Sequence, residues 1–318
     1  MQKDPTRDRY FGTTPAGTCL FFRVIGTNRK LGNYQIYIEA NFNGYQARDF
    51  HLKKAYATIN DWTVGYANST FSDPQALPPV IDASGPNAKM SATSVLVRWM
   101  HDLPKGFTIA ASLETPDQSI QTVDKETAKA SQYVPDIAVF AQWGFNTSDH
   151  IRLSAIYRSL SYRNLLTSKN KYAPGWGLQL STIWSPIRPL TLYGTVNGGA
   201  GYASLGGDWL MGNYDLVPDQ DKPGKLYSPY VVGGYAGIQY NITPSIFISG
   251  TFGGTRYCPK YPMERNEYKE GLYIAANVYW YLTPRISCGA EIDLGRRKNA
   301  DGATHWARRV NAMAQFSF

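Results

Sequence analysis

Residues 271–294 read GLYIAANVYWYLTPRISCGAEIDL, two alternating runs joined by a turn signal at 281–284. In the first run, apolar side chains from Leu272 to Leu282 occupy every second position. In the second, apolar side chains from Ile286 to Leu294 alternate with Ser, Gly, Glu and Asp. Because successive side chains of a strand point to opposite faces, each run predicts a strand with one apolar and one polar face.

The same period-two pattern recurs along the whole chain, and helical periodicity is hardly visible. It predicts fifteen strands, at about 18–26, 34–43, 51–60, 62–69, 91–101, 107–114, 134–146, 149–159, 174–185, 188–198, 229–241, 244–256, 266–281, 284–295 and 305–318.

The connections between these strands alternate in length. Short turns rich in Pro, Asn, Ser and Thr lie at 145–149, 184–189, 240–244 and 281–284. Longer polar stretches lie between them, at 44–50, 70–90, 115–131, 160–173, 198–226, 256–265 and 296–304. Alternating short and long connections are typical of outer-membrane barrels, whereas a soluble sandwich or propeller, the main alternative, does not separate its loops in this way.

The predicted fold class is therefore all-β: a single-domain (1–318), transmembrane, up-and-down antiparallel β-barrel of about sixteen strands in the bacterial outer membrane. Fifteen is odd, and both ends of a bacterial single-chain barrel lie in the periplasm, so we expect the first strand to be missing from this sequence. Irregular pairing of residues 5–17, or an unnoticed strand in 198–226, are the alternatives. The amphipathic last run, which ends on Phe318, also favours outer-membrane assembly.

Composition narrows the remaining classes. The 318 residues include 23 Tyr, 13 Phe and 8 Trp, carry a net charge of +8, and are 43 % apolar, so a disordered chain is excluded. No run approaches the length of an apolar transmembrane helix. Cys19, Cys258 and Cys288 have no ligand spacing, and we expect neither a disulfide framework nor a metal or other cofactor. The start has no apolar signal segment, which we expect to be removed or truncated.

One segment does not alternate. Residues 65–87 read GYANSTFSDPQALPPVIDASGPN and follow FHLKKAY at 50–56. This segment resembles the porins of the DcaP type, which carry Gly-x-x-x-Ser-Thr-Phe-x-Asp-Pro-x-Ala-Leu-Pro followed by Asp-x-x-Gly-Pro-Asn. The sequence departs from that family at Asn68, where Trp is usual, and at His51 and Lys53, where two Arg are usual.

The resemblance implies a homotrimeric, sixteen-strand outer-membrane channel for small anionic solutes such as dicarboxylates. It also implies that residues 70–90 form the third external loop, which folds into the barrel and narrows the pore. A loop packed on a neighbouring chain is the alternative. The residues predicted for this constriction are Ser69, Thr70, Phe71, Asp73, Pro74, Asp82, Gly85, Pro86 and Asn87.

Strand parity predicts which charged side chains face the lumen, since an arginine on the lipid face would cost about 2–4 kcal/mol at mid-membrane. The predicted pore-lining cations are Arg23, Arg98, Arg152, Arg158, Arg309 and one of Lys53 and Lys54. The predicted lumen acids are Glu39, Glu114, Glu291 and Asp293, which leaves an excess of about two positive charges and predicts an anion preference. Each arginine could instead form a structural ion pair. Tyr37 and Tyr193 could offer hydroxyls to a solute, or simply pack in the wall.

Enzyme motifs are absent from the sequence: its four histidines have no metal spacing, and it has no Gly-x-Ser-x-Gly elbow and no phosphate loop. We therefore predict a passive porin and not an enzyme, with an outer-membrane protease or lipase and a non-selective general porin as alternatives. The positive charges are scattered, which argues against nucleic-acid binding. The expected partners are outer-membrane lipid, lipopolysaccharide, two further copies of the chain and small anionic solutes.

Overall fold

The computed structural model describes residues 11–15, 17–43, 49–121, 125–207 and 214–318, which contain strands and short 3-10 turns but no α-helix. Within this part of the chain, no helix is long and apolar enough to cross a membrane. The strands are β1 (Cys19–Asn28), β2 (Gly32–Asn43), β3 (Asp49–Ile59), β4 (Trp62–Asn68), β5 (Thr93–Leu103), β6 (Phe107–Glu114), β7 (Thr127–Lys129), β8 (Asp136–Gly144), β9 (His150–Asn164), β10 (Lys169–Ile187), β11 (Leu190–Ala200), β12 (Val217–Pro218), β13 (Leu226–Tyr227), β14 (Tyr230–Thr243), β15 (Ile246–Cys258), β16 (Tyr268–Thr283), β17 (Ile286–Asn299) and β18 (Thr304–Phe316).

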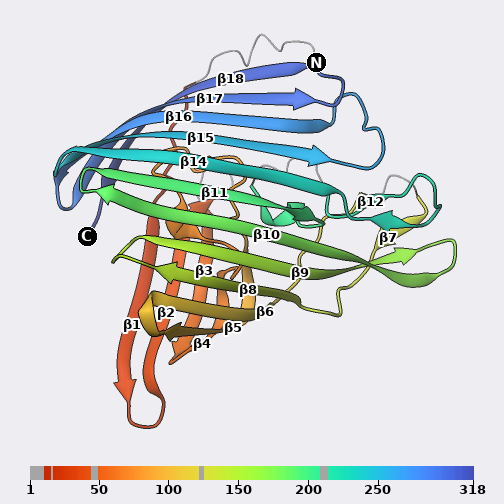
Figure 1. Cartoon of the computed structure of the whole chain (residues 1–318), viewed down its shortest axis with the longest axis horizontal. Helices are drawn as coiled ribbons and strands as arrows, with labels where there is room; N and C mark the ends of the chain where they lie inside the picture. The colour runs from red at the N-terminus through yellow and green to blue at the C-terminus, as the bar shows by residue number, and fades with distance from the viewer. Residues whose placement is uncertain (1–10, 16, 44–48, 122–124, 208–213) are drawn as a thin grey trace.

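Fifteen of these strands form one antiparallel sheet in which each pairs with the next along the chain, from β1 to β18, with β7 added on β9. The sheet curves round from β1, drawn in red, to β18, drawn in dark blue (Figure 1). Strands β12 and β13 form a separate small sheet. The predicted all-β fold class is confirmed, and the fifteen predicted strands correspond to these fifteen. Among the described residues, β1 pairs only with β2 and β18 only with β17.

The two faces of the sheet have opposite chemistry. On β17 and β18, Ile292 and Val310 are 58 % and 77 % exposed, whereas the intervening Glu291 and Asp293 are buried. Leu272, Ile274 and Ile286 are half-buried on the same side as Ile292, and Phe316 is exposed. A soluble domain would bury these apolar side chains in a central core, so the outer face is that of a barrel surrounded by lipid.

The strand ends follow the predicted rhythm at one side of the sheet. The short connections there are 29–31, 60–61, 104–106, 145–149, 188–189, 244–245 and 284–285.

At the other side, two predicted loops are wrong. Residues 160–173 were expected to be a loop, but β9 and β10 pair continuously from His150 with Ile183 to Asn164 with Lys169, which leaves only 165–168 as the turn. Similarly, β17 extends to Asn299 and reduces the predicted loop 296–304 to residues 300–303. The extension of β17, residues 296–299, is polar on both faces and lacks the apolar alternation of the other strands. In the β9–β10 extension, the apolar side chains Leu160, Tyr162 and Ala173 lie on the inner face and pack with Leu216 and Leu226, so the apolar face is the reverse of that of the membrane-spanning parts.

The buried apolar side chains lie on the inner side of the sheet, between the strands and the chain that follows β4. Phe71, Ala88 and Met90 pack there with Ile156 of β9 and with Tyr202, which precedes the 3-10 turn Ala203–Leu205. The Phe71 and Tyr202 rings meet edge to face, with centroids 5.9 Å apart.

Candidate pore site

Residues 69–90, here called the inner segment, lie against the inner face of the sheet. In Figure 1 this orange chain between β4 and β5 lies within the curve of the strands. Its first residues are almost completely buried, from Ser69 to Asp73. The Thr70 amide donates to Glu114 of β6 (2.8 Å), and Gln179 of β10 donates to the Phe71 carbonyl (3.2 Å).

Asp73 connects the inner segment to three side chains of β9 and β10. Its Oδ2 lies 2.9 Å from His150 Nε2 and accepts a hydrogen bond from Ser181 Oγ at 2.6 Å, and its Oδ1 lies 3.5 Å from Arg152 Nη1. Burial, the largest influence, would raise the pKa of Asp73. The hydrogen bond from His150, the charge of Arg152 and the hydrogen bond from Ser181 outweigh it and hold this pKa below its ordinary value of 3.8.

Strands β15 to β17 form a second anchor for the inner segment. Glu291 of β17 accepts hydrogen bonds from the backbone amides of Ile81 and Asp82, at 2.7 and 2.6 Å. The Pro79 carbonyl accepts from Ser249 of β15 and Asn277 of β16, both at 2.9 Å. Several backbone polar groups of the inner segment are thus satisfied by side chains of the wall, which hold the segment in place although it contains only one short 3-10 turn, Pro74–Ala76.

Arg309 of β18 completes this anchor. Its Nη1 donates to Asp82 Oδ1 at 2.9 Å. Prolines and glycines allow the close approach: a Cβ at Gly237 of β14 would lie 2.4 Å from Pro78, and one at Gly85 would lie 2.3 Å from the ring of Tyr273. The inner segment therefore reaches from β6 to β18 across the inner face.

The wall formed by β1 to β5, here called the opposite wall, carries four of the predicted lumen cations, Arg23, Lys53, Lys54 and Arg98. Arg23 of β1 is exposed and donates twice to Gln35 Oε1 of β2, at 3.1 and 2.8 Å. On the same face, Tyr37 donates to Glu39 at 2.9 Å, within the wall. Tyr193 of β11 likewise donates to Gln239 at 3.0 Å.

Lys53 and Lys54 both reach Glu39, at 3.0 and 2.8 Å. Parity alone predicts that only one of the two faces inward, and the structure corrects this. Glu39 pairs with Lys54 but Ala40 pairs with Leu52, so Lys53 is an extra residue in a β-bulge. A bulge interrupts the two-residue period, and it brings both ammonium groups to one carboxylate.

Arg98 of β5 lies next to the start of the inner segment, and Arg152 of β9 contacts the segment directly. Arg98 donates to the Asn68 carbonyl at 3.5 Å, its Nε is buried without a partner, and no acidic side chain of the described residues pairs with it. Arg152 donates twice to Gln142, at 2.8 and 2.6 Å, and once to the Ser72 carbonyl. Arg98 is thus the lumen arginine with the most unused hydrogen-bonding capacity.

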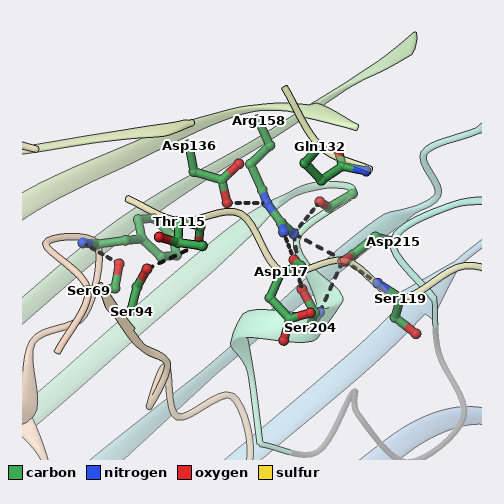
Figure 2. A network of polar contacts seen from close by, with 12 residues as sticks. Ser69, Ser94, Thr115, Asp117, Ser119, Gln132, Asp136, Arg158, Ser204 and Asp215 are labelled. Atoms are coloured by element: carbon green, nitrogen blue, oxygen red, sulfur yellow. Dashed lines mark hydrogen bonds and ion pairs between the residues drawn. The ribbon is translucent and has the colours of Figure 1, made fainter. Parts of the chain in front are cut away.

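Arg158 occupies a different environment from the other arginines. Its side chain is completely buried and forms ion pairs with Asp136 at 2.9 Å and Asp215 at 3.2 Å. Figure 2 shows it between these carboxylates, close to Asp117 and Ser204, and it also donates to the Asp117 carbonyl and to Ser204 Oγ (3.0 Å). Arg158 therefore joins β8 to residues of two connections, Asp117 on one side and Ser204 and Asp215 on the other. It forms structural ion pairs, and its buried side chain is not accessible to solutes.

Sequence reasoning missed several of these residues. Lys89 of the inner segment donates to the Ala83 carbonyl at 2.8 Å. Burial is the main reason why the pKa of Lys89 is below its ordinary value; the charge of Asp82 opposes this shift and that of Lys53 adds to it. Parity carries no information in a segment that does not alternate. His150 and Asp215 were missed because their partners are 77 and 57 residues away in the sequence. Among the described residues, no group of His, Cys, Asp or Glu has the arrangement of a metal site.

A curved antiparallel sheet with an apolar outside, a polar inside and an inner segment held against the wall defines the fold of outer-membrane channels. No family model and no curated protein matches this sequence.

Solved structures do match. The outer-membrane channel DcaP of Acinetobacter baumannii superposes with a TM-score of 0.81 at 19 % identity, covering 96 % of this chain and 86 % of that one. An anion-selective porin from Comamonas acidovorans gives a TM-score of 0.59 at 10 % identity, covering 96 % and 90 %. OmpT, an outer membrane protein of Vibrio cholerae in its trimer form, gives 0.59 at 10 % identity, covering 94 % and 90 %. The resemblance to DcaP-type porins is confirmed for the fold.

Proposed function

We propose that the chain is a porin of the bacterial outer membrane through which small anionic solutes, carboxylates among them, diffuse passively. The fold shared with outer-membrane channels supports the location and the transport role. The exposed apolar outer face supports it independently, because such a surface is stable only in lipid.

The distribution of accessible charge carries the anion preference. The acids at the inner segment are almost fully buried and already hydrogen-bonded. Asp73 and Asp82 of the segment bond to the wall, and Glu114 and Glu291 of the wall bond to the segment's backbone amides. Asp293 accepts hydrogen bonds from its neighbours Tyr273 and Asn311. The cations of the opposite wall are accessible: Arg23 is exposed and the Lys53 side chain is 47 % exposed. On the inner face of that wall, the cations Arg23, Lys53, Lys54 and Arg98 outnumber the carboxylates Glu39, Asp49 and Asp102, which leaves 4 − 3 = +1 charge. Low-dielectric walls concentrate such a field on the pathway.

The inner segment is proposed to narrow the pathway, so that solutes pass close to the opposite wall formed by β1 to β5. Its buried bonds support a fixed constriction and argue against a loop packed on a neighbouring chain. Arginine binds carboxylates bidentately, so Arg23 and Arg98 suit mono- and dicarboxylates better than neutral sugars. Binding must remain weak for the solute to leave, so a transient site is expected.

Reversal potentials across planar bilayers in a salt gradient test the proposal. The native channel should prefer anions at neutral pH, and Arg23→Gln/Arg98→Gln should remove most of that preference. Arg296→Gln/Arg308→Gln removes the same net charge from the outer face and should leave the preference unchanged. A cation-preferring native channel, or equal effects of the two double variants, would contradict it.

A non-selective sieve is the second candidate, favoured by the pairing of Lys53 and Lys54 with Glu39. The same measurement distinguishes it, since a sieve gives a reversal potential near zero. The cluster of His150, Asp73 and Ser181 contains the residue types of a catalytic triad, but its arrangement does not favour an enzyme. Asp73 stands between His150 and Ser181, whereas nucleophilic catalysis requires the histidine in the middle, next to the hydroxyl that it activates.

A further inference from the structure

Basic side chains gather on the outer face of β15 to β18, at the end near the connection 300–303. We call them the outer basic patch: Arg256, Arg296, Lys298, Trp306 and Arg308. Strand register aligns them in rows. Arg256 is opposite Glu270, which is opposite Lys298, and Arg296 is directly opposite Trp306. Arg308 lies diagonally next to Arg296, within reach of the same small ligand.

The patch stands directly above the apolar outer band. Paired residues of neighbouring strands share a face, so Arg308, opposite Leu294, belongs to the same face as Ile292 and Val310, which are opposite each other one row further down. These two apolar side chains are largely exposed. A ligand on this surface would meet positive charge at one end and hydrocarbon at the other.

The depth of the patch corresponds to the edge of the membrane. Ten residues separate Ile286, next to the short turn 284–285, from Arg296. Ten residues of a strand span about 34 Å, which at a tilt of about 40° is about 26 Å along the membrane normal. The apolar band of outer-membrane barrels is about 25 Å tall, so Arg296 lies at the level of the lipid headgroups on the side of the longer loops.

The charges of the patch are incompletely neutralised. Glu270 lies 3.3 Å from Lys298 and 3.8 Å from Arg256. Among the described residues, no acidic side chain pairs with Arg296 or Arg308, and Arg296 Nε is buried without a hydrogen-bond partner. The Arg296 guanidinium lies 5.9 Å from the centre of the Trp306 ring, a cation–π distance that orients it. Arg296 and Arg308 therefore have unused hydrogen-bond donors that can bind an anion.

We propose that the outer basic patch binds the phosphate groups of lipopolysaccharide, with its acyl chains lying on Leu294, Ile292 and Val310. Guanidinium groups recognise phosphate bidentately, and tryptophan favours the headgroup level of a membrane. The apolar band directly below the patch selects a phosphorylated lipid and not free phosphate. This inference rests on the proposed outer-membrane location but is independent of the solute.

The test uses the full chain folded in detergent and purified lipid A as the probe. Arg296→Gln/Arg308→Gln should weaken lipid A binding by about tenfold or more, because charge-assisted hydrogen bonds are lost. Lipid A without its phosphates should bind the native and variant chains equally. The lumen variant Arg23→Gln/Arg98→Gln serves as the matched control and should bind lipid A like the native chain.

Heat-modifiable migration on gels verifies folding, and Arg308→Gln alone provides a milder variant with an intermediate expected loss. Lipid A affinity within twofold of native in the folded double variant would overturn the proposal. Displacement of lipid A by inorganic phosphate at equal concentration would also overturn it, since the site would then recognise free phosphate. The porin proposal is tested separately, by bilayer currents of the native channel. Arg296→Gln/Arg308→Gln should leave these currents unchanged, so a failure of one proposal can be told from a failure of the other.

Discussion

Arg158 stands between two carboxylates with no surface of its own exposed to solvent. Removing one partner of a buried ion pair leaves the others uncompensated, at a cost of about 3–5 kcal/mol. Arg158→Met should therefore lower the free energy of unfolding by about this amount, measured by urea titration in lipid vesicles. The added changes Asp136→Asn and Asp215→Asn should restore part of it.

Arg163→Met, on the same strand, is the matched control. Its guanidinium bonds to Asn170 Oδ1 at 3.2 Å in an exposed position, and such contacts contribute about 1 kcal/mol or less. Equal destabilisation by the two variants would show that Arg158 has no special structural role.

The lowered pKa of Asp73 predicts a pH dependence. A carboxylate whose pKa is depressed by folding stabilises its contacts above its ordinary value of 3.8, and this contribution is lost as the pH falls through the lower folded value. The part of the single-channel conductance that depends on Asp73 should therefore be constant from neutral pH down to about 4 and change only in stronger acid. Asp73→Asn should show the changed conductance already at pH 7. A native change near neutral pH would point to another group.

At the scale of elements, the inner segment is the part whose removal is most informative. Deleting residues 72–84 removes the Asp73, Pro79 and Ile81–Asp82 anchors together, and should raise single-channel conductance because the pathway becomes wider. Channels are compared only when the deleted chain still shows heat-modifiable migration. Unchanged conductance in a correctly folded channel would mean that the segment does not set the narrowest point.

The strands were predictable because lipid on one side and a polar interior on the other impose a two-residue period, as at Leu272–Leu282. The extensions of β9 and β10 were not, since their apolar side chains Leu160, Tyr162 and Ala173 lie on the inner face and not on the outer one. The bulge at Lys53 could not be predicted either, because one extra residue changes which side chains face inward without changing the composition of the strand. The contacts of Arg158 with Asp215 and of Asp73 with His150 depend on how loops fold over the wall, which no local pattern encodes.

At the scale of the whole molecule, three identical chains are expected to form one assembly. The large exposed apolar outer face offers surface for such packing. Light scattering with correction for bound detergent should give three chains per particle in mild detergents. A monomer in several of them would contradict this expectation.

The long hairpin of β9 and β10 has a consequence for the cell surface. The 19 residues of β10 span about 65 Å, or about 50 Å along the membrane normal at a tilt of about 40°, roughly twice the height of the apolar band. In the proposed orientation, the turn at 165–168 projects well above the lipid (Figure 1, green). In this orientation, the turn is accessible to antibodies and bacteriophages at the cell surface. Substitutions in the turn 165–168 can change how antibodies and bacteriophages recognise the cell without altering the side chains that line the pore.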